Sequence, residues 1–191
     1  MSRNVIWIIF IALVVERFME TVLPDKIKKR GEVTCKWFFN YMLIVGILIY
    51  LFIVIEYAFI VKNINLAITF IGVVLVILRI ILKIWVVKTL GKFWSIQIEI
   101  REDQKLIKEG PYRFMRHPSY FSTIIEATAG PLIFNAYFTL IFVWIVYIPL
   151  LLVRIYLEEK ELVRYFGKKY ENYKKEVYAL LPLKIYKGDD L

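Results

Sequence analysis

The chain has 191 residues, of which 60% are hydrophobic and 17% aromatic, and its mean hydropathy is +0.61. These values lie far from those of soluble proteins, and the apolar residues form runs long enough to cross a bilayer, which takes about 20 residues per helix. The composition predicts an integral membrane protein and leaves no room for a separate soluble domain of ordinary size. The net charge of +9 fits positive loops that contact anionic membrane lipids, and we expect no nucleic acid partner.

Hydropathy and helix-breaking residues predict an all-α membrane fold with five spans. A first, short helix ends in a charged stretch before Pro24, and the second and third helices are joined so tightly that they form an antiparallel hairpin. The turn between the fourth and fifth helices is expected at Asn135. The five predicted spans cover residues 5–15, 37–61, 64–87, 120–134 and 136–156.

The fourth predicted span differs from the others because it is polar and broken. Ser, Thr and a Gly-Pro pair interrupt it, which is typical of a helix inside a bundle or against a cavity. Glu126 lies in the middle of this span, so we expect it to line a substrate path or to bond to Arg154. Three other charged residues in the spans are expected to snorkel or to pair within the bundle, namely Glu56, Arg79 and Lys83.

The distribution of Lys and Arg predicts the orientation. These residues gather in segments 26–36 and 88–116 and in the tail, whereas the alternate segments carry only Arg3 and Lys62. Positive loops stay on the cytosolic side, so the N-terminus is expected outside and the C-terminus in the cytosol. A charged amphipathic helix is expected at residues 158–177, as an interfacial lid over the functional site.

We expect a single domain over residues 1–191. Three spans would occupy residues 1–87, and residues 88–191 would form the catalytic region with two spans and the tail helix. The catalytic region contains a polar island at residues 110–120, Gly-Pro-Tyr-Arg-Phe-Met-Arg-His-Pro-Ser-Tyr, which holds the only histidine of the chain, His117. So many polar groups beside membrane helices are costly, and their presence indicates a functional site.

The island does not suggest a metal centre or a standard nucleotide site. One histidine without paired cysteines gives few metal ligands, so we expect no metal. The chain contains neither Gly-x-Gly-x-x-Gly nor a phosphate-binding Gly-Lys-Ser/Thr motif, so a cofactor would bind in a non-Rossmann site. Pro111 and Pro118 fix the backbone on both sides of the island and leave neighbouring amides and carbonyls free for a ligand.

Four motifs follow one another in the catalytic region. They are Gly-Pro-Tyr-Arg at residues 110–113, Arg-His-Pro-Ser-Tyr at 116–120, Arg154 four residues before Glu158 of a Glu-Glu pair, and Phe-Gly-Lys-Lys-Tyr at 166–170. In this order they resemble the isoprenylcysteine carboxyl methyltransferase family. The resemblance is good over residues 85 to 182, while the first three spans match in hydropathy alone. Members are integral membrane enzymes that use S-adenosylmethionine, so the resemblance implies this cofactor.

The resemblance also implies roles for individual residues. Arg154 and Glu158 would be the catalytic pair, with Arg154 on the substrate. Gln104 stands where eukaryotic members often have His, and Glu126, which is not part of the family pattern, is assigned with Arg154 to the substrate. Cofactor contacts are implied at Gln97, Gln104, Lys105, Leu106, Ile107, Tyr112, His117, Pro118, Ser119, Tyr120 and Glu158.

Physical chemistry makes the catalytic pair reasonable. Transfer of a methyl group from a sulfonium to a carboxylate neutralises opposite charges in an in-line displacement, so it needs alignment and dryness rather than a general base. Arg154 can hold a carboxylate through two hydrogen bonds. Glu158, one turn later on the same helix face, can face the cationic cofactor. The plain alternative is an ion pair between these two residues at a helix end.

The predicted function is therefore methylation of a lipophilic carboxylate, such as prenylcysteine or an analogue, that enters from the bilayer while S-adenosylmethionine enters from the cytosol. Phospholipid amines and lipid-like polyketide oxygens are alternative acceptors. A second alternative is an NADPH-dependent membrane reductase related to sterol reductases, which would need a basic site for the ribose phosphate. A third is a membrane scaffold without enzymatic activity, which would show no cofactor affinity.

Overall fold

A computed structural model describes two long parts of the chain, residues 36–93 and 105–183. Residues 5, 6, 9, 10 and 13 of the first predicted span, together with Gln97 and Gln104, lie outside the described residues. The structure also describes residues 7–8, 11–12, 14–15, 17 and 185–186 and two short strands, β1 (Glu32–Val33) and β2 (Glu99–Ile100), which pair antiparallel.

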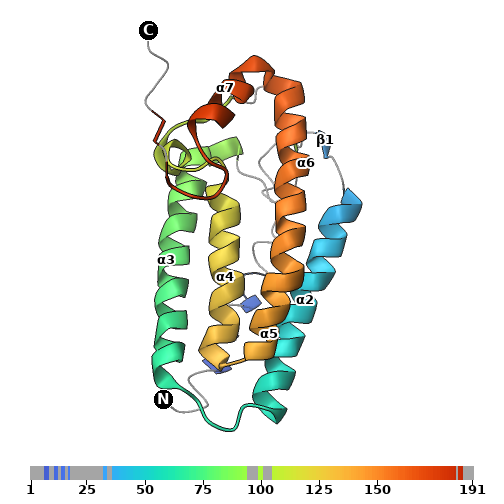
Figure 1. The fold of residues 1–191 in the computed structure, drawn as a ribbon, viewed down its shortest axis with the longest axis vertical. Helices are drawn as coiled ribbons and strands as arrows, with labels where there is room; N and C mark the ends of the chain where they lie inside the picture. The colour runs from blue at the N-terminus through green and yellow to red at the C-terminus, as the bar shows by residue number, and fades with distance from the viewer. Residues whose placement is uncertain are drawn as a thin grey trace.

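Long helices run side by side along the molecule (Figure 1). Three of them are α2 (Lys36–Phe59), α3 (Leu66–Leu90) and α4 (Pro118–Phe134). A fourth column is continuous from α5 (Tyr137–Phe142) through the π-helical segment η3 (Val143–Tyr147) into α6 (Ile148–Phe166). The 3-10 helix η1 (Gly91–Phe93) follows α3, η2 (Gly110–Arg113) precedes α4, and α7 (Lys168–Glu176) lies across the end of the bundle where α6 finishes (Figure 1).

Three of the helices in the described part of the chain are long and apolar enough to cross a membrane: Trp37–Phe59, Leu66–Leu90 and Tyr137–Phe166. They correspond to the second, third and fifth predicted spans. Many large apolar side chains on them are exposed, as expected for helices in contact with lipid. The fourth predicted span is helix α4, whose 17 residues are fewer than the roughly 20 needed for a full span.

The predicted boundary of the tail helix is wrong. Helix α6 passes through Glu158 without interruption and ends at Phe166, and α7 is a separate helix of nine residues. Nothing between Tyr156 and Lys160 disfavours a helix, whereas Gly167 adopts φ 57°, a left-handed conformation that ends α6. The Arg154–Glu158 pair therefore lies within one rigid helix.

Buried polar groups close the end of the bundle that lies away from α7. Asn135 forms the predicted turn with φ 56°, and its amide nitrogen donates to Oγ1 of Thr69 at 2.9 Å. The carboxylate of Glu56 accepts from the backbone nitrogens of Phe138 and Thr139 at 2.9 and 2.8 Å. Glu56 thus caps the first turn of α5, which confirms that it pairs within the bundle.

Helices α3 and α4 approach closely where α3 has no side chain. A Cβ atom at Gly72 would lie 2.7 Å from Cγ1 of Ile133 and 2.8 Å from its backbone nitrogen, so any larger residue would push the helices apart. Small residues serve this purpose in membrane helix pairs. The contact holds the C-terminal end of α4 against α3.

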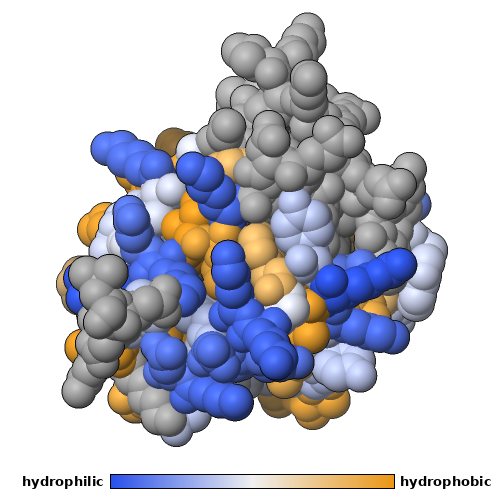
Figure 2. Space-filling model, turned by 90° about the horizontal axis from the view of Figure 1, so that it is seen from above, coloured by the Kyte–Doolittle hydropathy of each residue, from blue (hydrophilic) through white to orange (hydrophobic). Residues whose placement is uncertain are grey.

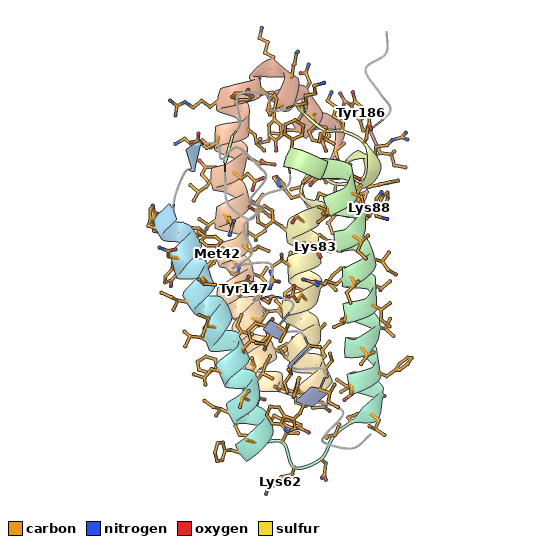
Figure 3. The ribbon with its side chains drawn as sticks, turned by 180° about the vertical axis from the view of Figure 1, so that it is seen from behind. Met42, Lys62, Lys83, Lys88, Tyr147 and Tyr186 are labelled. Carbon is orange, nitrogen blue, oxygen red and sulfur yellow. The ribbon has the colours of Figure 1, made fainter. Side chains whose placement is uncertain are left out.

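The two ends of the bundle differ in character. Lys62 marks the end with the α2–α3 connection, and Lys88 and Tyr186 mark the opposite end (Figure 3). We call the latter the polar end; it consists of η2, the start of α4, the end of α6 and helix α7. Figure 2 looks onto this end, where hydrophilic residues cover much of the described surface and hydrophobic residues lie among them and at the rim.

Candidate active site

The polar island enters α4 through a tight turn. Gly110 adopts φ 56°, and a Cβ atom there would lie 2.5 Å from Oγ1 of Thr89. Glycine therefore allows the island to pack against the end of α3. Pro111 is buried, and Pro118 occupies the first turn of α4, where the missing amide proton costs nothing.

The tail of the chain is hydrogen-bonded to the island. The backbone nitrogens of Arg116 and His117 donate to the carbonyl oxygens of Tyr178 and Ala179, each at 2.9 Å. The hydroxyl of Tyr173 donates to the carbonyl oxygen of Tyr112 at 2.6 Å. The tail thus packs directly on the predicted site, although its helix is shorter than expected.

Three tyrosines at this contact are held in the neutral form. Burial raises the pKa of Tyr112, Tyr170 and Tyr173 well above the ordinary value. Leu106 packs against the cluster that Tyr170 and Tyr173 form with the tail. The phenols can therefore act as hydrogen-bond donors over the whole physiological pH range.

The hydroxyl of Tyr120 links the predicted catalytic pair. Nε of Arg154 donates to this hydroxyl at 3.0 Å, and the hydroxyl donates to the carboxylate of Glu158. The guanidinium carbon of Arg154 lies 5.5 Å from the ring centres of both Phe39 and Tyr120, and its Nη1 is 4.0 Å from Sδ of Met42. Arg154 is thus buried, with 8% exposure, between aromatic and thioether groups.

Glu159, next to Glu158, binds a different set of partners. Its carboxylate accepts from Nε and Nη2 of Arg116 at 2.8 and 2.6 Å, and it lies 3.1 Å from Nε2 of His117. Nζ of Lys174 is 2.7 Å from its other oxygen. Glu159 therefore joins the island and α6 through side chains that are buried or nearly so, and it joins α7 through the exposed Lys174.

His117 faces both carboxylates. Nε2 lies against Glu159, while Nδ1 is 3.9 Å from Oε1 of Glu158. Its ring lies 5.7 Å from the ring of Tyr120. Sequence reasoning placed His117 in the site but missed that Glu159, Arg116 and Lys174 hold it there; the Glu-Glu and Arg-His pairs were the available signals.

The structure brings most of the predicted site residues to the polar end. Lys105 is exposed, and Leu106 and Ile107 are half-buried in the segment that leads to η2. Ser119 lies in the first turn of α4, where its carbonyl oxygen accepts from Thr123. The predicted site residues gathered at this end are Lys105, Leu106, Ile107, Tyr112, His117, Pro118, Ser119, Tyr120, Arg154 and Glu158.

Glu126 lies deeper in the bundle. Its Oε2 is 2.7 Å from Nη2 of Arg79, and its Oε1 accepts from Nε of Arg17 at 3.0 Å. The hydroxyl of Tyr50 is 3.4 Å away. Arg79 pairs within the bundle as expected, and the Arg17 contact was not anticipated because the two residues are 109 positions apart in the chain.

Residues 68–164 match the sequence model of the isoprenylcysteine carboxyl methyltransferase family. The chain belongs to this family. The fold agrees: a solved structure of the eukaryotic intramembrane Ras methyltransferase, an isoprenylcysteine carboxyl methyltransferase, superposes with a TM-score of 0.70 at 20% identity, covering 94% of this chain and 67% of that one.

Relatives of known and unknown activity match the chain. The uncharacterised protein YpbQ of Bacillus subtilis is 31% identical over 168 residues, 85% of this chain and 99% of YpbQ. The protein-S-isoprenylcysteine O-methyltransferase of Dictyostelium discoideum is 36% identical over 88 residues, 46% of this chain and 37% of that enzyme. The methanethiol S-methyltransferase of Crocosphaera subtropica is 39% identical over 71 residues, which are 37% of this chain and 27% of that enzyme. Family membership makes this chain a membrane methyltransferase.

Proposed function

We propose that this enzyme transfers a methyl group from S-adenosylmethionine to the carboxylate of a lipophilic acceptor embedded in the membrane. The observation that carries the proposal is the pairing of Arg154 and Glu158 through the hydroxyl of Tyr120. One member of the pair attracts an anion and the other a cation, and they lie one turn apart on α6. A carboxylate acceptor and a sulfonium donor have these charges.

The donor set at the polar end fits S-adenosylmethionine. The side chain of Glu158 is 28% exposed, so its carboxylate can reach a cationic group of the cofactor. The rings of His117 and Tyr120 and the neutral phenol of Tyr112 offer surfaces and donors for the adenosine. Lys105 is exposed and can approach the cofactor's carboxylate. The bound cofactor would supply an electrophilic methyl group, and Gln97 and Gln104 are proposed as further contacts.

The residues around Arg154 suit the acceptor half of the reaction. Its guanidinium is buried and flanked by two aromatic rings, so a carboxylate that reaches it loses water and gains two parallel hydrogen bonds. Tyr120 holds Nε and thereby sets the plane of the guanidinium. Because charges neutralise during transfer, no proton needs to move, and the main task of the protein is alignment in a dry site.

We also propose that the polar end faces the cytosol. Most of the Lys and Arg residues that the structure describes lie at or beside this end, and Lys62 marks the opposite end (Figure 3). Positive segments remain on the cytosolic side of membranes. The cofactor would then enter from water, and the acceptor would enter sideways from the bilayer, whose apolar phase meets the exposed side chains of α2, α3 and α6.

The acceptor class is proposed to be prenylcysteine or a similar thioether-linked lipid acid. The Dictyostelium discoideum relative, whose name specifies this substrate, supports the assignment, and so does the anion-binding character of Arg154. The test is calorimetry on the detergent-purified protein with S-adenosylhomocysteine and NADPH, followed by a methylation assay with N-acetyl-S-prenylcysteine. We expect binding of S-adenosylhomocysteine and formation of a methyl ester. Binding of NADPH alone would refute the proposal.

A further inference from the structure

A second polar layer lies below Arg154 in the bundle. Helices α2 and α4 run away from the polar end, and α6 runs toward it (Figure 1). From Met42 to Tyr50, from Tyr120 to Glu126 and from Arg154 to Tyr147 the three helices descend by about 9 to 12 Å. The upper layer is Met42, Tyr120 and Arg154; the lower polar layer is Tyr50, Arg79, Glu126 and Tyr147, with Arg17.

The lower polar layer is built around a buried ion pair. Glu126 and Arg79 are 8% and 2% exposed, and they approach to 2.7 Å. Tyr147 lies seven residues before Arg154 in the α5–α6 column, which places it at the level of Glu126. Charged groups at this depth are costly and most often mark the path of a substrate or an ion.

Apolar side chains separate the two layers. Ile124, Leu150 and Leu151 pack with Met42 and Tyr147 in one cluster, and Figure 3 shows Met42 and Tyr147 one below the other in the interior beside α2. The backbone changes at the same level, because the π-helical segment η3 ends at Tyr147. Single π turns occur frequently at functional sites. The same three helices thus present an anion-binding group, an apolar stretch and a second polar layer.

We propose that the lower polar layer recognises a hydroxyl or carbonyl group of the acceptor, about two helical turns beyond the carboxylate that Arg154 holds. The inference rests on the proposed function and narrows it: the natural acceptor is a lipophilic acid with polar groups at two depths, not one with a purely hydrocarbon tail. Tyr147 donates to that group, and the Glu126–Arg79 pair fixes the position of the layer.

The test compares three N-acetyl-S-alkylcysteines of equal chain length. One has a plain alkyl chain, one carries a hydroxyl about 10 Å from the carboxylate, and one carries the hydroxyl on the second carbon from the sulfur. The wild-type protein should methylate the second acceptor with a kcat/KM about tenfold higher than either of the others. Tyr147→Phe should bring this ratio close to one. Tyr156→Phe, on the same helix but 68% exposed, should leave both the activity and the ratio unchanged.

Binding separates the inference from the proposed function. Calorimetry measures the affinity of each acceptor in the presence of S-adenosylhomocysteine, so the preference can be read without turnover. Methylation of all three acceptors with equal kcat/KM would overturn the inference and leave the proposed function intact. If none of the three acceptors were methylated, the proposed function would be overturned. The calorimetric affinities would still test the inference, and equal affinities for the three acceptors would overturn it as well. A purely structural role of Tyr147 would lower kcat/KM for all three acceptors by the same factor, which would likewise overturn it.

Discussion

Nε of Arg154 donates a hydrogen bond to the hydroxyl of Tyr120 at 3.0 Å. The same hydroxyl donates to Glu158, so one phenol orients both the group proposed for the acceptor and the group proposed for the methyl donor. Since α6 is unbroken between Arg154 and Glu158, one helical turn sets the separation of these two residues. The hydroxyl of Tyr120, from α4, sets the orientation of their side chains.

Removal of this hydroxyl should weaken both halves of the site. Tyr120→Phe leaves a buried guanidinium and a carboxylate each short of a partner, at a cost of about 1 to 3 kcal/mol. We expect affinity for S-adenosylmethionine, measured without an acceptor, to fall by about 5- to 150-fold and kcat to fall as well, measured by calorimetry and by methyl-ester formation. Tyr156→Phe serves as the exposed control. Equal affinities in all three proteins would contradict the shared role of Tyr120.

The neighbouring carboxylates of Glu158 and Glu159 should respond differently to neutralisation. Glu158→Gln should lower affinity for S-adenosylmethionine, measured without an acceptor, by about 1.5 to 3 kcal/mol with little change in thermal unfolding. Glu159→Gln removes the partner of Arg116, His117 and Lys174, and breaking a buried ion cluster costs about 3 to 5 kcal/mol.

Thermal unfolding in detergent without cofactor should therefore show a large loss for Glu159→Gln only. Calorimetry on the same samples should show the larger affinity loss for Glu158→Gln. If Glu159→Gln unfolded like the wild type, the ion cluster would not hold the tail on the island. If both variants bound the cofactor normally, Glu158 would not belong to the donor site.

The parts of the site that follow from local sequence were predictable. The spacing of Arg154 and Glu158 places them one turn apart on any helix, and the Pro-flanked island had to lie at a helix entry. Glu159 shows the limit, because its partners come from α4 and α7, and only the folded chain brings them together. Helix periodicity gives no information on such long-range partners.

The secondary structure was likewise predicted where it depends on local sequence and missed where it depends on other signals. The hydropathy of α2, α3 and the α5–α6 column predicts them directly, since α2 and α3 are apolar over most of their length and the column is apolar up to Leu157, apart from Arg154. The end of α6 was misplaced because the change from apolar to charged residues at Glu158 is not a helix stop, whereas Gly167 is. The partners of Glu126 were open because Arg17 and Arg79 come from distant segments.

The buried phenols predict a loss of stability at high pH. Burial raises the pKa of Tyr112, Tyr170 and Tyr173 above the ordinary value of 10.0. Above about pH 10 the unfolded chain releases these protons while the folded protein retains them, so the free energy of unfolding falls as pH rises. Below that pH the phenols are neutral in both states and contribute no slope.

Thermal unfolding between about pH 8 and 11 measures this slope. Tyr173→Phe should make the decline shallower because one buried proton site is lost, even though the variant also loses the hydrogen bond to the carbonyl of Tyr112. The exposed-site variant Tyr156→Phe is the control and should decline like the wild type. A wild-type stability that does not change across this range would show that the phenols ionise equally in both states.

The shape of the guanidinium should matter more than its charge at residue 154. Arg154→Lys keeps a cation but not the planar pair of donors that fixes a carboxylate for in-line attack. We expect methylation of N-acetyl-S-prenylcysteine to lose most of its rate, while affinity for S-adenosylhomocysteine stays within about twofold, since Arg154 is assigned to the acceptor and not to the cofactor. Initial rates and calorimetry on both proteins measure the two effects.

The pH dependence then decides the charge of the acceptor. A carboxylate is already ionised at neutral pH and needs no general base, so the rate with the carboxylate acceptor should be flat between about pH 6.5 and 9. A phospholipid amine must lose a proton before it attacks, so its rate would rise with pH, and Arg154 would repel its charged form. Robust amine methylation that increases with pH and is unaffected by Arg154→Lys would therefore refute the assignment of Arg154 to a carboxylate, because the acceptor would then carry no carboxylate and the planar geometry of the guanidinium would not contribute to the reaction.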